Sequence, residues 1–317
     1  MEYEEYRNRA KEFICKITNE FYMNRAGLKD SLNSSEIYAE YNDLFEKERV
    51  LKLMGSVDLS EHDSLLDVSE KMLRMLYLKA FAIDGFLDTS VRGLTDKIVS
   101  SETQTTIEFQ NQKIPYRAIS VILANEANAE LRKNLDLKKQ NVIRKLNPIR
   151  EERITHLHSL ADELGYSDYL SLYTDIKGFD FSSLTDKIKE FLHNTDSIYT
   201  YSIEKAASTR LGLKLSEVNR HDISFLFRGT EFDPMFPENE LIANLEKTVD
   251  GMGLGRELYP NIDIDIESRE GKSPRAFCAP LRIPDEIVLV LMPHGGHDDY
   301  ETILHEAGHA WHFASVL

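Results

Sequence analysis

The chain has 317 residues, of which 42% are hydrophobic and 29% charged, and this composition excludes a wholly disordered protein. Acidic residues number 54 against 38 basic ones, which gives a formal net charge of −16. A protein that binds nucleic acid or an anionic membrane surface needs a cationic face, so neither partner is expected. At this length one hydrophobic core is usually not enough, and two lobes are expected.

The start of the chain and its cysteines indicate a cytoplasmic protein. Residues 1–7 are acidic and no apolar stretch follows them, so no secretory signal peptide is expected. The longest clean apolar run, residues 287–292, is far shorter than the about 20 residues that cross a membrane. Cys15 and Cys278 are the two cysteines, and without an export signal we expect both to be reduced.

Apolar residues recur at helical spacing through most of the chain, as far as about residue 255. This pattern predicts helices around residues 6–21, 37–45, 65–80, 121–135 and 184–192. We expect the apolar faces of all five helices to be buried in a hydrophobic core. The chain is therefore predicted to be mainly α.

The hydrophobic period changes near Tyr259. Residues 261–267 alternate between apolar and acidic side chains, which predicts a half-exposed β-strand with its acidic residues, among them Asp265, in solvent. Further strands are predicted over residues 275–281 and 287–291, the latter buried because it is apolar and β-branched. A small β-sheet is thus expected just before the C-terminal segment.

The segment with recognisable chemistry follows this sheet. Asp298 and Glu301 resemble a capping box, which predicts that a helix starts here and continues to the last residues. In that helix the motif His305-Glu306-x-x-His309 places two histidines on one face, where both imidazoles can reach one Zn²⁺. Glu306 lies about 100° further round, where it can accept a proton from a water on the metal. We predict His305 and His309 as zinc ligands, Glu306 as general base, and one Zn²⁺ per chain.

The spacing of the two histidines has a second interpretation, a hydrogen-bonded pair without a metal. Gly308 between them costs about 1 kcal/mol relative to alanine inside a helix, which indicates a packing or functional reason. Trp311 is expected to face the core, away from the metal.

His294 and His297, in the sequence Pro-His-Gly-Gly-His, precede the motif helix. They are candidates for lining a substrate cleft, and a solvated loop is the alternative. Direct binding of the metal by either histidine also stays open, because the motif itself supplies only two ligands.

The motif and its surroundings resemble the active-site helix of the thimet oligopeptidase and oligoendopeptidase F family of zinc peptidases. The resemblance covers about residues 272–313, including His312, which matches a further histidine of that family, and Asp299 shortly before the first ligand. It implies a mainly α, two-lobed helical zincin-type metallopeptidase with a small β-sheet next to the active-site helix. It also implies His305 and His309 as zinc ligands with Glu306 as general base.

The same resemblance implies a division of the chain. Residues 1–180 would form an N-terminal helical lobe and residues 181–317 the first part of the catalytic domain. The family takes its third zinc ligand and its oxyanion-stabilising residues from positions further along the chain, whereas only eight residues follow His309. We therefore expect the C-terminal part of the catalytic domain to be absent from this chain, and the chain alone to be inactive or nearly so.

Taken together, these features predict a zinc-dependent metallo-oligopeptidase that hydrolyses peptide bonds of short peptides. Two other interpretations stay open. One is a non-catalytic helical scaffold or binding protein that retains half a metal site, and the other is a related zinc metallocarboxypeptidase.

Overall fold

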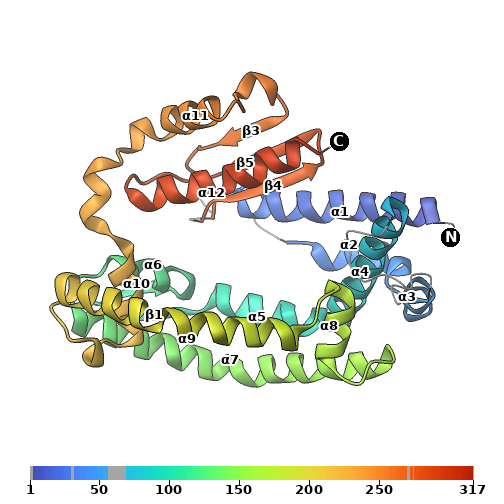
Figure 1. Ribbon diagram of the computed structural model, residues 1–317, viewed down its shortest axis with the longest axis horizontal. Helices are drawn as coiled ribbons and strands as arrows, with labels where there is room; N and C mark the ends of the chain where they lie inside the picture. Colours follow the sequence, from blue (N-terminus) through green and yellow to red (C-terminus); the bar gives the residue numbers. More distant parts are fainter. Residues whose placement is uncertain (1–2, 30–31, 56–68, 270–271, 274, 317) are drawn as a thin grey trace. The chain divides into compact units, whose positions relative to one another are not determined.

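The computed structural model describes residues 3–29, 32–55, 69–269, 272–273 and 275–316 (Figure 1). Most of these residues are helical, and the strands form two small sheets. The mainly α fold predicted from the sequence is confirmed. Among the described residues, every helix is too short or too polar to cross a membrane.

The chain folds into two compact units. The first consists of Met1–Asn42 and Gly229–Leu317, and the second of Asp43–Arg228. The predicted division at residue 180 falls inside the second unit. The first helix packs with the C-terminal sheet as well as with residues 34–41, so both ends of the chain belong to one unit.

The first unit is built around a three-stranded sheet. Its elements are α1 (Tyr3–Arg25), α2 (Ser34–Glu40), α11 (Leu241–Gly251), β3 (Ile262–Asp265), β4 (Phe277–Arg282), β5 (Glu286–Val290) and α12 (His297–Ala314). The central strand β5 pairs with β3 in parallel and with β4 antiparallel, so β4 is an edge strand. The predicted strands are thus found close to their expected places.

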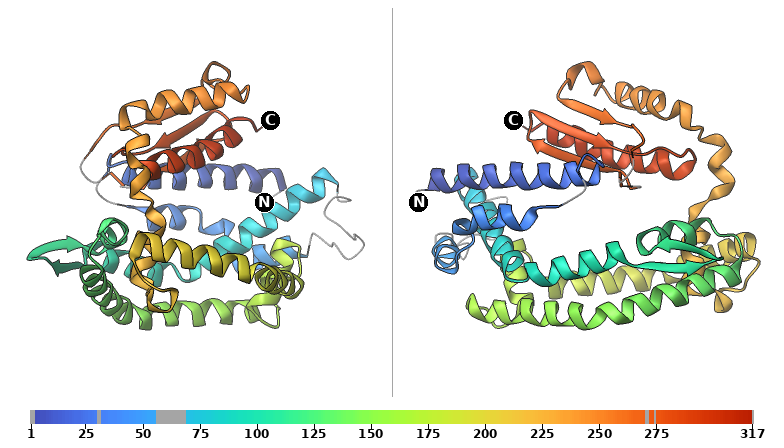
Figure 2. Two further views of the ribbon diagram at one scale, coloured as in Figure 1. Left: turned by 60° about the vertical axis from the view of Figure 1, so that its left-hand side comes forward. Right: turned by 180° about the vertical axis from the view of Figure 1, so that it is seen from behind.

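Both faces of this sheet are covered. On one face Ile262, Ile287 and Leu289 pack with α11 and α12. On the other, Val288 and Val290 pack with the end of α1, which runs alongside β4 (Figure 2). Because successive strand residues point to opposite faces, β5 must be apolar at consecutive positions.

The acidic side chain of Asp265 in β3 does not face solvent as predicted. Its carboxylate accepts a hydrogen bond from Lys272 Nζ at 2.9 Å and pairs with Arg269. Lys272 is buried, and its ammonium group also donates to the carbonyl oxygen of Glu267 at 2.7 Å. Burial by itself would raise the pKa of Asp265, but the hydrogen bonds from Arg269 and Lys272 outweigh it and lower the pKa. Arg269 Nε also donates to the carbonyl oxygen of Ala26, so this network ties the segment after β3 to the end of α1.

The second unit consists of helices and one hairpin. Its elements are α3 (Lys47–Met54), α4 (Glu70–Ser90), α5 (Arg92–Gln104), β1 (Thr106–Phe109), β2 (Gln112–Pro115), α6 (Ile119–Asn125), α7 (Ala129–Glu163), α8 (Tyr169–Lys177), α9 (Phe181–Ala206) and α10 (Arg220–Arg228). Gln110 and Asn111, both with positive φ, form the two-residue turn of the hairpin, which the sequence analysis did not foresee.

Two of the predicted helices of this unit differ from the structure. The helix expected over residues 121–135 is two helices, because Asn128 ends the connection after α6 and caps α7 by accepting hydrogen bonds from the amides of Glu130 and Leu131. Of the helix expected over 65–80, residues 65–68 lie outside the described residues, and α4 begins after the N-cap Ser69.

The apolar face predicted over residues 184–192 is not buried. Leu184, Ile188, Phe191 and Leu192 lie on α9, and all four side chains are exposed. The helical period was predicted correctly, but the expected burial is wrong.

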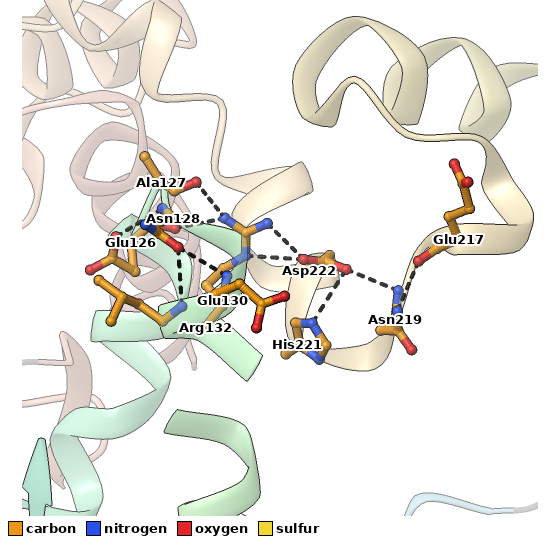
Figure 3. Close-up of polar contacts among 10 residues, drawn as sticks. Glu126, Ala127, Asn128, Glu130, Arg132, Glu217, Asn219, His221 and Asp222 are labelled. Atoms are coloured by element: carbon orange, nitrogen blue, oxygen red, sulfur yellow. Dashed lines mark hydrogen bonds and ion pairs between the residues drawn. The ribbon is translucent and has the colours of Figure 1, made fainter. Parts of the chain in front are cut away.

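A buried ion pair joins the start of α7 to α10 (Figure 3). The side chains of Arg132 and Asp222 are each 2% exposed. Asp222 Oδ1 accepts hydrogen bonds from Nε and Nη2 of Arg132, at 3.1 and 2.6 Å, and Oδ2 accepts one from the amide of Asn219 at 3.0 Å. Arg132 Nη1 donates to the carbonyl oxygens of Glu126 and Ala127, at 2.8 and 2.9 Å. Both charges therefore have partners in a place that water does not reach.

Asp222→Asn should destabilise the second unit by about 3–5 kcal/mol, because the substitution leaves the Arg132 charge buried without a counter-charge. Urea unfolding followed by far-UV circular dichroism measures the effect. Asp186→Asn is the matched control, since Asp186 pairs with Lys189 at 3.9 Å on the surface and should contribute little. Equal shifts for the two substitutions would contradict the assignment of a stabilising role to the buried pair.

Candidate metal centre

The motif residues lie in the middle of α12, which packs on the sheet through one side. The buried residues of this side are Ile303, Ala307, Ala310 and Trp311. The indole Nε1 of Trp311 donates a hydrogen bond to the carbonyl oxygen of Leu254 at 2.7 Å. The predicted inward orientation of Trp311 is confirmed, and it fixes which side of the helix faces outward.

His305 and His309 lie one turn apart on the exposed side of α12. Their Nε2 atoms are 3.3 Å apart. Two nitrogens that bind one tetrahedral zinc at about 2.0–2.1 Å would be about 3.3 Å apart, so the separation of the pair matches that of two zinc ligands. The same distance allows one imidazole to hydrogen-bond to the other. An exposed ring does not need such an internal partner, however, because water can satisfy it.

Glu306 is half-buried and turned toward the sheet. Its Oε2 accepts a hydrogen bond from the backbone amide of Cys278 in β4 at 2.9 Å. Cys278 can offer this amide because β4 is an edge strand. Within the described part of the chain Glu306 forms no other hydrogen bond, which leaves Oε1 available as a proton acceptor. Sequence reasoning missed this contact, since it joins residues 28 positions apart on different elements.

The Cys278 thiol is not a candidate nucleophile. Burial, with a smaller contribution from the charge of Glu306, raises the pKa of Cys278 to about 12. A thiol with so high a pKa stays protonated at neutral pH and reacts slowly. The contact of this residue with the motif is made by its backbone amide, which donates to Glu306 Oε2.

The start of α12 differs from the predicted capping box. The helix begins at His297 after Gly296, and no side chain caps it. Instead, Asp299 Oδ2 accepts hydrogen bonds from the amides of His294 and Gly295, both at 2.6 Å. Asp299 therefore holds the preceding loop against the first turn of the helix.

The two histidines of this loop have different surroundings. His297 is packed beside the rings of Phe232 and Phe236, and its amide donates to Asp233 Oδ1 at 2.9 Å. His294 borders a pocket of about 670 Å³ whose other lining residues include Met292, Ile266, Leu241 and Glu238. His297 is thus not in a solvated loop, and a role of either residue in a substrate cleft stays a prediction.

No third ligand joins the motif pair among the described residues. In this part of the chain the group of three potential ligands is His297, Asp298 and Glu301, whose ligand atoms lie within 4.8 Å of one another. This group excludes His305 and His309. It lies at the N-terminal end of α12, where the helix dipole favours carboxylates without any metal, so we assign no ion to it. Direct binding of the motif metal by His294 or His297 finds no support.

Gly308 lies between the two motif histidines. A Cβ atom built on it meets nothing within 4 Å, so packing among the described residues does not explain this glycine. His312, four residues further, is exposed and contacts the ring of Phe313 rather than the motif pair.

Gly308→Ala should raise the free energy of unfolding by about 1 kcal/mol, because alanine loses less backbone entropy in a helix. The fluorescence of Trp311 on the same helix can follow urea unfolding. Gly85→Ala, in α4, is the comparison with the opposite expected sign, since its added Cβ would overlap the ring of Phe45. A lower free energy of unfolding in Gly308→Ala would indicate that a group outside the described residues packs against Gly308, where the added Cβ would lie.

Comparisons with family models and with curated proteins found no match for the sequence. Among solved structures, the chain is similar to PZ peptidase A with an inhibitor, at a TM-score of 0.60 and 14% identity. It is also similar to a structure described as an oligoendopeptidase F, at a TM-score of 0.57 and 12% identity. Both matches cover 98% of this chain, which spans 63% and 62% of those two chains. At such low identity the likeness concerns the fold, and it agrees with the mainly α fold with a small sheet that the motif resemblance implied.

Proposed function

We propose that this chain forms the zinc-binding part of a metallo-oligopeptidase that hydrolyses peptide bonds of short peptides. The observation that supports this proposal most directly is the 3.3 Å separation of the His305 and His309 Nε2 atoms on the exposed side of α12. Glu306 beside the edge strand and the peptidase-like fold support the same proposal. Because the chain spans less than two thirds of its structural neighbours, the activity of a whole protein is part of the proposal.

His305 and His309 would hold the metal through their Nε2 atoms, each as a neutral imidazole. Zinc in such a site supplies a Lewis acid and lowers the pKa of a bound water to about 7. The chain's own contribution is Glu306. Its Oε1 would take a proton from the attacking water and return it to the leaving amine nitrogen, while Cys278 N–H holds Oε2 in place.

A catalytic zinc site needs three protein ligands and one open position. The described residues bring together two at this place. We therefore propose that the chain by itself binds zinc weakly and turns over peptides slowly or not at all. The missing third ligand is also what favours the scaffold alternative, so metal binding must be measured directly.

The compartment is part of the same proposal. Cys15 and Cys278 are both free thiols in the structure. Reduced thiols are the normal state in the cytoplasm, where we propose that the protein acts.

His305→Ala and His309→Ala should each lower the zinc affinity of the 317-residue chain by about tenfold or more, because each removes one of two ligands. Glu306→Gln should leave the affinity nearly unchanged. Competition with a chromophoric chelator at neutral pH measures these affinities. His312→Ala is the matched control, being exposed on the same helix. Unchanged zinc affinity in both His→Ala variants would contradict a metal site at His305 and His309 and would favour the interpretation as a non-catalytic scaffold.

Peptide hydrolysis by the chain should depend on zinc and should be lost in Glu306→Gln. Its rate should be more than about tenfold lower than that of PZ peptidase A under the same conditions, because oxyanion donors and a third zinc ligand both contribute to the rate. Internally quenched peptides with both ends blocked are the substrates. Cleavage restricted to peptides with a free C-terminus would indicate a metallocarboxypeptidase instead. Turnover within tenfold of PZ peptidase A would show that a third ligand comes from this chain after all.

A further inference from the structure

Helix α9 (Figure 1) carries an apolar face whose large side chains are exposed. Six large side chains share this face, each exposed by 38–68%: Leu184, Ile188, Phe191, Leu192, Ile198 and Tyr199. Ile203 is the one buried residue of the helix. A helix of this kind normally gains most of its stability by burying its apolar face. An exposed apolar face on α9 is therefore typical of a protein–protein interaction site.

The spacing of these residues fits another helix. Leu184, Phe191 and Ile198 recur at intervals of seven, and Ile188 and Thr195 occupy the alternate positions between them. An average spacing of 3.5 residues is the pattern of a seam between paired helices. The 26 residues of α9 give this seam a length of about 39 Å.

The area of the face is sufficient for a stable contact with a second copy of the chain. If each of the six side chains still exposes about 100 Å², the face offers about 600 Å². Two copies would together bury about 1,200 Å², the lower end of the range for specific interfaces. A pair of α9 helices thus reaches the required area without any further contact.

The charge of α9 also permits self-association. The helix has four acidic and three basic residues, a net charge of −1, whereas the whole chain carries −16. The charge of this helix therefore opposes the approach of a second copy only weakly.

A pocket at the N-terminal end of α9 indicates the direction of pairing. Phe181, the first residue of the helix, lines this pocket of about 480 Å³ together with His158, Tyr169 and Tyr173. The opposite end of the helix presents the exposed side chain of Tyr199 on the same face. Antiparallel pairing brings this tyrosine of one copy to the aromatic pocket of the other.

We propose that α9 is a dimerisation helix, through which two copies of this chain pair antiparallel along the face formed by the six side chains. The contact is isologous, since the same face serves on both copies and a two-fold axis closes the pair. The proposal is independent of the metal site on α12.

Sedimentation equilibrium of the 317-residue protein over the micromolar range tests the proposal. We expect a mass of twice 36.5 kDa. Phe191→Glu and Ile198→Glu should each shift the protein to the monomer mass, because both place a charge inside the seam. Leu137→Glu on α7 is the matched control, since Leu137 is 54% exposed outside the face and its substitution should leave the dimer intact.

Circular dichroism of each variant shows whether it is folded, and Phe191→Ala provides a milder change that should weaken the dimer without adding a charge. A monomeric wild-type protein over the whole range would overturn the proposal. So would an equal loss of the dimer in Leu137→Glu and Phe191→Glu. A monomer with α9 amides protected from hydrogen exchange would show that another part of the chain covers the face.

Discussion

Burial of β5 on both faces is the constraint on which the candidate site depends. A central strand that is apolar at consecutive positions must have helices on both sides of the sheet. The end of α1 covers one face and α12 covers the other. Because α12 is held by Ile303, Ala307 and Trp311, its rotation about its own axis is fixed, and with it the direction of every other side chain on the helix.

The positions of the motif residues follow from this packing. Buried residues of α12 recur at helical spacing, so His305 and His309 are left on the outer side, where a metal and a substrate can reach them. Glu306 lies between the inner and the outer side and meets the edge of the sheet at Cys278. The hydrophobic core therefore orients the proposed general base relative to the proposed ligands.

Local patterns in the sequence predicted local structure well. The motif helix, the three strands before it and the inward orientation of Trp311 all depend on periodicity within a short segment, and all are found. The predicted start of α12 was wrong because Asp298 and Glu301 have the spacing of a capping box but both lie inside the helix, which begins at His297. The hairpin at residues 106–115 was not predicted, because its strands are too short to show a clear alternation of apolar and polar residues.

Features that depend on distant partners could not be predicted in this way. The alternation in β3 is the same whether Asp265 faces water or the buried ammonium of Lys272. The apolar period of α9 shows that the helix is amphipathic but not what covers it. The place of α1 against the sheet joins residues such as Ala26 and Ala279, whose contact leaves no signal in either segment alone.

That distant contact has a consequence for synthesis of the protein. Unit two is an insertion in unit one, so the ribosome completes residues 43–228 before the sheet exists. Ala26 can contact Ala279 only after 253 further residues have been synthesised. At about 5–20 residues per second, α1 spends tens of seconds outside the ribosome without the sheet on which its C-terminal end packs. During that time the side chains that later pack on the sheet, such as Tyr22, are accessible to chaperones. The first helix to be synthesised is thus among the last to complete its packing.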